Sequence, residues 1–594
     1  MNLKLRLQPG RPGEVPLIPI GVLVLAISVW QGVLMSASRD LRTTFGDTDD
    51  ALRLVIVRDL LSGRAGWYDQ HLGRLQPPLG MDSHWSRLVD GGLAALQRLF
   101  ELFMAPPQAE LAMRFTWPLL WIPPVVFATL IIARRLAGPS GAFLAAVICA
   151  MSLSLYLQWL PGRIDHHDVQ ITLCMLAVAG AVLPGRAWAL AASLATGLGL
   201  AVGVEALVFL AIVGAGFALR FAFGPQDEER RAQAYAAGLL CSLTLLFLIQ
   251  TPPARWGVSV CDALGVNLTA AIAVGCLAFL AAMPLVRNRN ILTRLIALAG
   301  VGGMAGAVYV AMLPTCIGGP LAQADPRLWS IWLNNVAEMR PLLLIEPGLY
   351  AGLKLSLMVI ILAGAAAALW LGLARRRRDA DWILLTTCFA VAVAVSLGAA
   401  RMAFYAGWFA VPLIATAAWD LGSTRWRGRL IPVFVLVASV PMVANAAQMS
   451  LQSWHGRQLV AATHQMETCA RPGEYRLLAG LPTGLVLSEI DEGPNVLVTT
   501  MHAVVAAPYH RMAWGIIAGH DALGAQPGSD ERAVRGLGVT YVLNCPGQAA
   551  NTNHSQLDAQ SLQARLDRRQ TPDWLQPLSP ASAPLQVYAV RPLP

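Results

Sequence analysis

Residues 140–184 read SGAFLAAVICAMSLSLYLQWLPGRIDHHDVQITLCMLAVAGAVLP. Two apolar runs, at about 140–158 and 169–184, flank a turn that holds Asp165, His166, His167 and Asp168. Apolar runs approaching about 20 residues predict membrane-spanning helices. Ionisable groups are costly beside lipid and are usually kept there for function. This stretch therefore predicts a polytopic α-helical membrane protein with a polar site at the ends of its helices.

The whole chain has the composition of a membrane protein. Of its 594 residues, 56% are hydrophobic and 13% are charged, whereas soluble chains carry about 25% charged residues. We predict about thirteen spans, at about 16–36, 116–135, 140–158, 169–184, 187–203, 204–223, 235–250, 266–286, 292–313, 349–372, 381–400, 403–420 and 429–447. The net charge of +9 does not indicate nucleic-acid binding, because the arginines lie in short loops.

Positive charges fall in alternate loops between the predicted spans. They are Lys4, Arg6, Arg11, Arg134, Arg135, Arg186, Arg230, Arg231, Arg287, Arg289, Arg375 to Arg378, Arg425, Arg427 and Arg429. Because positive loops favour the cytoplasm, the opposite loops lie outside, among them the long first loop at about 37–115. An odd number of spans also sends the tail outside. We expect a bacterial inner-membrane protein with a periplasmic tail.

Two domains follow from this pattern: a transmembrane domain at 1–447 and a small α/β domain at 448–594. In the tail we expect strands at 485–490, 496–500, 503–507, 539–545 and 587–590, and a helix at 530–536. Two pairs of cysteines can form disulfides if they lie outside the cytoplasm. They are Cys469 with Cys545 and Cys261 with Cys316.

Three carboxylates stand together in Asp47-Thr48-Asp49-Asp50, just outside the first predicted span. Oxygen ligands at this spacing suit Mg²⁺ or Mn²⁺, but the same side chains can cap a helix that begins near Ala51. Residues 52–61 have apolar residues at helical spacing, which predicts a helix on or near the membrane interface. His84 and Arg87 follow in a segment that also suits the interface.

Further polar residues share the outer side with these acids. Asp165 to Asp168 suit Mn²⁺ or form a polar turn, and Glu338 is either a ligand or solvated surface. Arg401 suits a phosphate, because its planar fork binds two oxygens, or anchors the interface. In the tail, residues that suit acceptor contact or ordinary surface and core positions are Glu489, Asp491, His502, Tyr509, His510 and Arg511.

Together, a metal held by acids, an arginine for phosphate and a membrane interface suggest a reaction. A lipid-linked phosphate donor would lie in the bilayer, and the arginine and metal would stabilise charge on the leaving phosphate. One carboxylate would act as general base on the acceptor.

With these motifs in order, the chain resembles the GT-C superfamily of membrane glycosyltransferases, most closely the catalytic subunit of oligosaccharyltransferase. Asp49 precedes Arg58-Asp59-Leu60-Leu61-Ser62-Gly63, which is similar to the family's first-loop motif. Residues 162–167 resemble its second-loop motif, with His167 where the family has an acid. Residues 335–341 resemble a third motif, and Arg401 stands at the outer start of a late span. The tail lacks the Trp-Trp-Asp-Tyr-Gly signature, which leaves a glycan, a lipid or a protein as the acceptor.

The resemblance implies an inverting transfer of a sugar or oligosaccharide from a polyprenyl-phosphate or polyprenyl-diphosphate donor. It implies catalytic roles for Asp49, Asp165 and Glu338. A divalent cation, Mn²⁺ or Mg²⁺, would be held by Asp49, Asp165, His167 and Glu338, and Arg401 would bind the donor phosphate. Additional candidates are Asp47, Asp50, His166, Asp168, His84, Arg87, Tyr405 and His510.

Three other functions remain open. The first is a single-sugar transferase that modifies lipid A or a glycan. The second is a transporter or flippase with ion-coupling acids, for which Glu205 is the acid inside an apolar run. The third is a scaffold or receptor without catalysis, which divalent-ion binding would distinguish from the enzymes.

Overall fold

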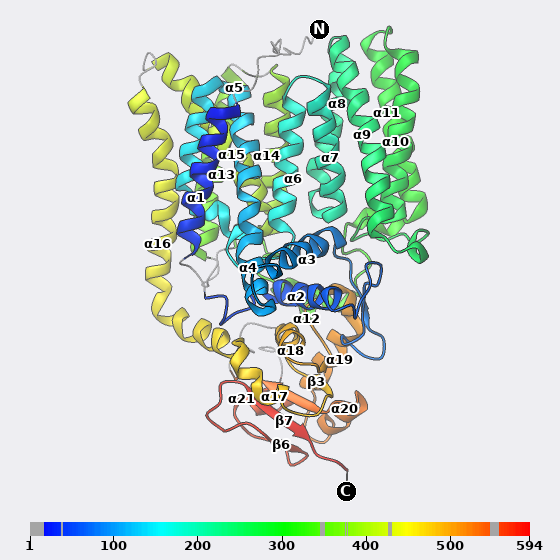
Figure 1. The fold of residues 1–594 in the computed structure, drawn as a ribbon, viewed down its shortest axis with the longest axis vertical. Helices are drawn as coiled ribbons and strands as arrows, with labels where there is room; N and C mark the ends of the chain where they lie inside the picture. Colours follow the sequence, from blue (N-terminus) through cyan, green and yellow to red (C-terminus); the bar gives the residue numbers. More distant parts are fainter. Residues whose placement is uncertain are drawn as a thin grey trace.

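In the computed structural model, a bundle of long helices carries a small domain at one end (Figure 1). The structure describes residues 17–36, 40–344, 351–374, 376, 378–425, 430–546 and 558–593. Some basic residues that contribute to the predicted orientation lie outside the described residues: Lys4, Arg6, Arg11, Arg375, Arg377, Arg427 and Arg429. We call the end of the bundle next to the small domain the C-domain end.

The bundle is built from α-helices that run roughly parallel to its long axis (Figure 1). They are α1 (Leu17–Ser36), α5 (Ile122–Met151), α6 (His167–Val182), α7 (Arg186–Val202), α8 (Leu207–Phe223), α9 (Gln226–Gln250), α10 (Val266–Val286), α11 (Ile291–Met312), α13 (Ala351–Ala374), α14 (Ala380–Ser396), α15 (Ala403–Arg425) and α16 (Leu430–Cys469). Among the described residues, nine helical segments are long and apolar enough to cross a membrane, and α6, α7 and α14 are apolar but shorter.

The helical segment from Pro106 to Met151 is interrupted. Ala137 and Gly138 have non-helical backbone angles just before Pro139, because proline lacks an amide hydrogen and clashes with the preceding turn. The break falls between the predicted spans at 116–135 and 140–158, so a loop is present where we expected one. The total of about thirteen spans stays a prediction.

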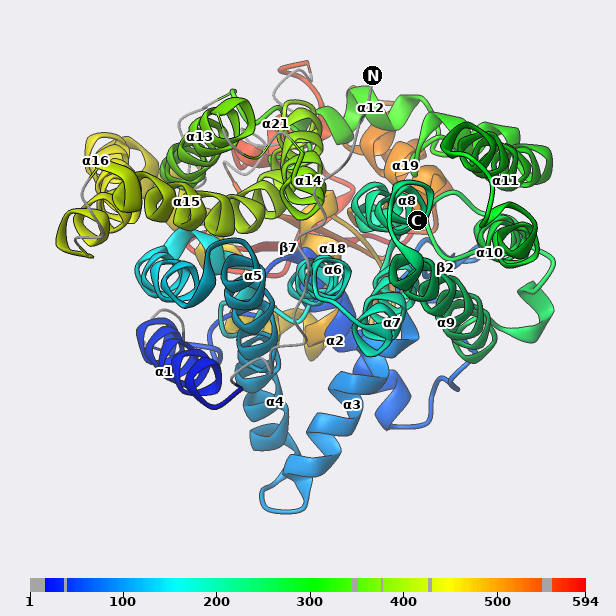
Figure 2. The same ribbon diagram turned by 90° about the horizontal axis from the view of Figure 1, so that it is seen from above.

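Helix α15 lies at the centre of its part of the bundle, between α5 and α13 (Figure 2). Its Trp408 is fully buried and meets Tyr156 and Trp159 edge-on, at ring-centroid distances of 5.3 and 5.4 Å. Tyr156 and Trp159 belong to a 3-10 helix, η1 (Leu153–Trp159), that follows α5. Burial of these large rings holds the chain just before the acidic turn.

A layer of shorter elements lies between the bundle and the small domain (Figure 1). It contains α2 (Thr48–Leu61), β1 (His71–Leu72), β2 (Met81–Asp82), α3 (Arg87–Glu101) and α4 (Pro106–Leu120). The helix expected at 52–61 is confirmed as part of α2. It does not lie open on the interface, because Leu52, Leu54 and Val57 are at most 1% exposed and α18 (Gly493–Thr499) packs against it.

The small domain has a five-stranded mixed sheet in the order β4-β3-β5-β7-β6. Its strands are β3 (Leu485–Leu487), β4 (Ala503–Val504), β5 (Tyr541–Asn544), β6 (Leu575–Pro577) and β7 (Gln586–Val590), and its other helices are α17 (Arg476–Ala479), α19 (Ala513–Leu523), α20 (Asp530–Gly536) and α21 (Leu562–Asp567). Strand β3 is parallel to β4 and β5, whereas β7 is antiparallel to β5 and β6. The predicted α/β class and the predicted helix at 530–536 are confirmed.

One predicted strand is wrong. Residues 496–500 fall mostly in α18, although valine and threonine favour strands. Pro494 stands in the first turn of α18, where proline is tolerated. The apolar side chains of α18 then pack on α2, so tertiary burial overrides the local strand preference.

The first loop continues the sheet of the small domain. Leu75 bridges Val504 in parallel, with the amide of Gln76 donating to the carbonyl of Val504 at 2.8 Å. The two expected disulfides are present, Cys261–Cys316 and Cys469–Cys545. The boundary predicted at 447/448 lies inside α16, so one helix passes from the bundle to the small domain.

Candidate functional site

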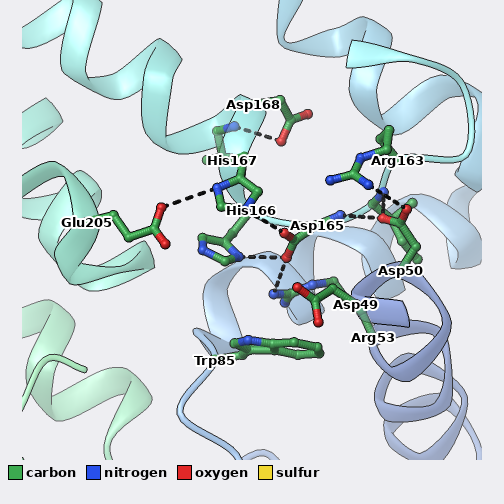
Figure 3. Close-up of polar contacts among 12 residues, drawn as sticks. Asp49, Asp50, Arg53, Trp85, Arg163, Asp165, His166, His167, Asp168 and Glu205 are labelled. Atoms are coloured by element: carbon green, nitrogen blue, oxygen red, sulfur yellow. Dashed lines mark hydrogen bonds and ion pairs between the residues drawn. The ribbon is translucent and has the colours of Figure 1, made fainter. Parts of the chain in front are cut away.

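Five segments bring polar side chains to the C-domain end of the bundle. They are the start of α2, the turn before α6, the loop at 336–342, and the 3-10 helices η2 (Val204–Ala206) and η6 (Ala400–Met402). Figure 3 shows the first two segments together with Glu205 of η2. Residues from 49 to 401 therefore share one region, although they are far apart in the sequence.

Asp47 and Asp50 form a capping box at the start of α2. Asp47 Oδ1 accepts the amides of Asp49 and Asp50 at 3.0 Å, and Asp50 Oδ2 accepts the amide of Asp47 at 3.1 Å. Asp50 Oδ1 also accepts the amides of Ile164 and Asp165, at 2.7 and 3.0 Å. The helix-cap interpretation is therefore correct for these two residues, and Asp50 fixes the acidic turn to α2.

Asp49 differs from its two neighbours. Within the described parts of the chain, no donor lies within hydrogen-bond distance of its carboxylate. Figure 3 shows this carboxylate beside the Arg53 guanidinium. Its burial, followed by the charges of Asp165 and Glu338, raises the pKa of Asp49 well above its usual range. Asp49 is thus a carboxylate that takes up a proton readily, next to other acids.

Asp165 is surrounded by cationic and imidazole groups. Its Oδ1 lies 2.6 Å from His166 Nδ1 and 3.3 Å from Arg53 Nη2, and its Oδ2 lies 3.2 Å from His167 Nε2. Burial opposes ionisation of this carboxyl, but His166, His167 and Arg53 outweigh it and hold the pKa of Asp165 well below its usual range. Asp165 is therefore a fixed negative charge.

Arg53 was not among the predicted site residues. Its side chain is fully buried, its Nη1 lies 2.7 Å from Asp90 Oδ1, and its guanidinium lies 4.5 Å from the ring of Trp85. It stands four residues after Asp49, which places both side chains on one face of α2. The signal in the sequence was a cation inside the apolar stretch at 51–57 of this helix.

A chain of ion pairs runs from His167 toward α15. His167 Nδ1 lies 3.4 Å from Glu205 Oε2, and Arg401 Nη1 lies 2.7 Å from Glu205 Oε1 and 3.8 Å from Glu338 Oε1. The backbone joins the same segments, because the amide of Arg401 donates to the carbonyl of Glu338 at 3.0 Å. Arg401 and Glu338 are thus brought together, with Glu205 as their link to His167.

Glu205 was predicted inside an apolar run, and the structure places it near the first end of one, the segment Val204–Phe223. It lies in η2, the turn between α7 and α8 at the C-domain end. Gly203 ends α7, and a Cβ there would lie 2.6 Å from Gln170 Nε2, so a larger residue would have to displace the Gln170 side chain. The acid that favoured a transporter thus lies at the first end of the apolar segment Val204–Phe223, and not at its middle.

Other predicted residues have different surroundings. Asp168 accepts the amide of Val169 at 2.7 Å and points away from His167 in Figure 3. Arg87 binds Asp90 and the carbonyls of Trp67 and Asp69, which is a structural role. Tyr405 stacks on Phe209 at 4.8 Å, and its buried hydroxyl has no hydrogen-bond partner among the residues described.

The tail residues divide into two groups. Tyr509 donates to the carbonyl of Thr48 at 2.8 Å, one residue from Asp49, whereas the His502 ring contacts the amide of Gly484 and the carbonyl of Leu478 within the small domain. Burial, then Glu489 and Glu492, raises the pKa of Asp491 to about 7. His510 and Arg511 both contact Asp262 of the membrane domain.

No protein-family profile and no curated protein sequence matches the chain. Among solved structures, it is similar to the archaeal oligosaccharyltransferase AglB from Archaeoglobus fulgidus, in complex with an inhibitory peptide and a dolichol-phosphate. That match has 14% identity, a TM-score of 0.65, and covers 96% of this chain and 75% of that chain. A structure of the Archaeoglobus fulgidus oligosaccharyltransferase in complex with Zn and sulfate has 15% identity and a TM-score of 0.60, covering 97% and 74%.

The structure of ArnT from Cupriavidus metallidurans in the apo state matches with a lower TM-score, 0.41. That match has 13% identity and covers 97% of this chain and 99% of that chain. The chain therefore has the fold of the oligosaccharyltransferases, and the GT-C fold expected from its motifs is confirmed.

Proposed function

We propose that the chain is an integral membrane glycosyltransferase. It moves a sugar or oligosaccharide from a polyprenyl-phosphate or polyprenyl-diphosphate donor to a glycan, lipid or protein acceptor at the periplasmic face of a bacterial inner membrane. One observation carries this proposal. Asp49 and Asp165 lie close together at the end of the helical bundle, and ion pairs connect Asp165 through His167 and Glu205 to Arg401. The dolichol-phosphate bound to the similar AglB supports a lipid phosphate as the donor.

The oxygen and nitrogen atoms of the site that could act as metal ligands fit a divalent cation, Mn²⁺ or Mg²⁺. Asp165 Oδ2 is buried and accepts no hydrogen bond within the described structure, and the Asp49 carboxylate lacks a donor there too. The carboxylates of the site outnumber its arginines: Asp49, Asp165, Glu205 and Glu338 against Arg53 and Arg401. The cation would be held by Asp49, Asp165, His167 and Glu338, and when bound it would neutralise charge on the donor phosphate.

Each residue then has a task. Asp49 takes the proton of the acceptor as a new bond forms to the anomeric carbon, because its carboxylate has no donor within hydrogen-bond distance among the described residues and is free to accept one. The bond to the phosphate oxygen breaks in the same displacement, which inverts the anomeric carbon. Arg401 donates to the leaving phosphate, since its Nε is buried and unpaired among the described groups. His166, His167 and Arg53 together keep Asp165 ionised and in place.

The test is sugar transfer by the purified full chain in lipid nanodiscs. The assay uses a panel of synthetic polyprenyl-phosphate and polyprenyl-diphosphate sugars, with release of the free lipid phosphate as its readout. Asp49→Asn should reduce release at least about a hundredfold, as expected for loss of a general base. The matched control is Asp47→Asn, two residues away on the same helix, because asparagine also caps a helix.

Equal release by Asp49→Asn and the wild type would refute the role of Asp49. Failure of every donor on the panel with a well-folded wild type, while a soluble nucleotide sugar is used instead, would refute the lipid-phosphate donor.

A further inference from the structure

A second group of metal-ligating side chains lies apart from the proposed catalytic acids. His84 follows β2 in the first loop, Asp262 lies between α9 and α10, and His510 begins η9 (His510–Met512) in the small domain. One ligand atom from each of these residues lies within 4.8 Å of the other two. Three segments that are distant in the sequence thus converge on one point at the domain interface.

The geometry within this group is close. His510 Nε2 lies 2.7 Å from Asp262 Oδ2, and the rings of His84 and His510 have centroids 4.6 Å apart. His84 Nδ1 is buried and has no hydrogen-bond partner in the described part of the chain. A buried polar nitrogen without a partner is unfavourable. The ion pairs of Asp262 with His510 and Arg511 do not provide a partner for His84 Nδ1. A ligand that binds this nitrogen would provide one.

Neighbouring groups hold the side chain of Asp262 in place, as the groups around a metal ligand usually do. Its neighbour Cys261 is bonded to Cys316. Arg511 grips both carboxylate oxygens, from Nε to Oδ2 at 2.7 Å and from Nη2 to Oδ1 at 2.6 Å, and also donates to the carbonyl of Asp82 at 3.0 Å. A carboxylate has about four lone-pair sites, so Asp262 can hold Arg511 and a cation together.

We propose that His84, Asp262 and His510 form a second divalent-metal site, selective for Zn²⁺, which fixes the small domain to the membrane domain. Two imidazoles and one carboxylate suit Zn²⁺, whereas Mg²⁺ prefers oxygen ligands alone. Three protein ligands leave a fourth, tetrahedral position for water. The metal replaces the hydrogen bond between His510 Nε2 and Asp262: the proton of Nε2 is released to solvent or the ring changes tautomer and keeps its proton on Nδ1, and the freed lone pair of Nε2 binds the ion.

The site connects to the catalytic region through adjacent residues. Trp85 follows His84 and stacks on Arg53, and Tyr509 precedes His510 and donates to the carbonyl of Thr48. The rings of Trp85 and Tyr509 meet edge-on at 5.6 Å. A metal that fixes His84 and His510 therefore also fixes the two rings that support Arg53 and the start of α2.

The experiment measures zinc in the purified full chain by mass spectrometry, after chelation and reloading with Zn²⁺. The background variant is Asp49→Ala/Asp165→Ala/His167→Ala, so that zinc at the catalytic acids does not contribute. We expect about one zinc ion per chain to remain. His84→Ala or His510→Ala in this background should abolish it. His71→Ala, which changes an exposed histidine of the same loop, should not. Zinc that is retained in both the His84→Ala and the His510→Ala variants, or that is absent from the background variant, would overturn the proposal.

A second measurement guards against misfolded variants. His84→Cys and His510→Cys keep a ligand for the metal, and Co²⁺ bound to a cysteine thiolate shows sulfur-to-cobalt charge-transfer absorption. We expect this absorption in both cysteine variants and not in the parent protein. Cobalt-loaded variants that lack it would overturn the assignment, and its presence would establish each residue as a ligand.

Discussion

Replacing Arg53 by methionine tests how the fold supports the site. Methionine has a similar length but no charge, so it leaves Asp90 and Asp165 without this partner. All three side chains are at most 2% exposed, and removing one member of a buried ion pair costs about 3–5 kcal/mol. Each acid keeps another partner: Asp90 has Arg87 Nη1 at 3.2 Å from Oδ2, and Asp165 has the two imidazoles next to it in the sequence. We therefore expect the free energy of unfolding to decrease by about 3 kcal/mol, the low end of that range.

The assay is chemical denaturation of the purified full chain in detergent micelles. Arg64→Met is the matched control, since Arg64 pairs with Asp59 while its own side chain is 54% exposed, and such pairs contribute at most about 1 kcal/mol. The double variant Arg53→Met/Asp165→Asn should be less destabilised than the sum of its single changes, by about 2 kcal/mol, because asparagine leaves no stranded charge. An effect of Arg53→Met no larger than that of Arg64→Met would refute this reasoning.

Three further predictions follow from single contacts. Asp50→Ala removes the acceptor of the Ile164 and Asp165 amides. Each amide left without a partner costs about 1–3 kcal/mol, so the turn that carries Asp165 should be held less firmly in place. If about 1.4 kcal/mol of that loss is felt in the transition state, the rate of sugar transfer falls about tenfold, and we expect at least this decrease. Asp491 has a raised pKa of about 7, so its contribution to stability is full below its unfolded pKa of about 3.9 and is lost as pH rises toward 7. Asp491→Asn should therefore stabilise the protein at pH 8 but not at pH 4, in thermal melts at both pH values. Cys469→Ala/Cys545→Ala opens a loop with a sequence separation of 76 and should destabilise the small domain by about 4 kcal/mol, measured as faster proteolysis of the tail.

The sequence predicts the membrane fold well, because apolar runs and positive loops are local signals. It also predicts that Asp49, Asp165, Glu338 and Arg401 share one side of the membrane, since alternate loops share a side. The structure places these four residues within one network of charges. The topology alone did not separate Asp49 from Asp47 and Asp50, because capping depends on which amides each carboxylate reaches.

Several contacts of the predicted and unpredicted site residues are long-range, and local patterns do not encode them. The predicted boundary between the spans at 187–203 and 204–223 places Glu205 at a helix end, but His167 and Arg401 reach it from other segments. Arg53 is stable in the interior only because Asp90 and Asp165 approach it from other segments. His84, Asp262 and His510 meet only when the small domain docks, so no spacing in the sequence could join them.

The most direct test of the central claim is native mass spectrometry of the full chain released from nanodiscs that contain a polyprenyl phosphate. The account predicts one bound lipid phosphate per chain, reduced at least about tenfold by Arg401→Met and unchanged by Arg98→Met, which alters an exposed arginine on α3. Equal lipid retention by both variants, or none by the wild type, would contradict it.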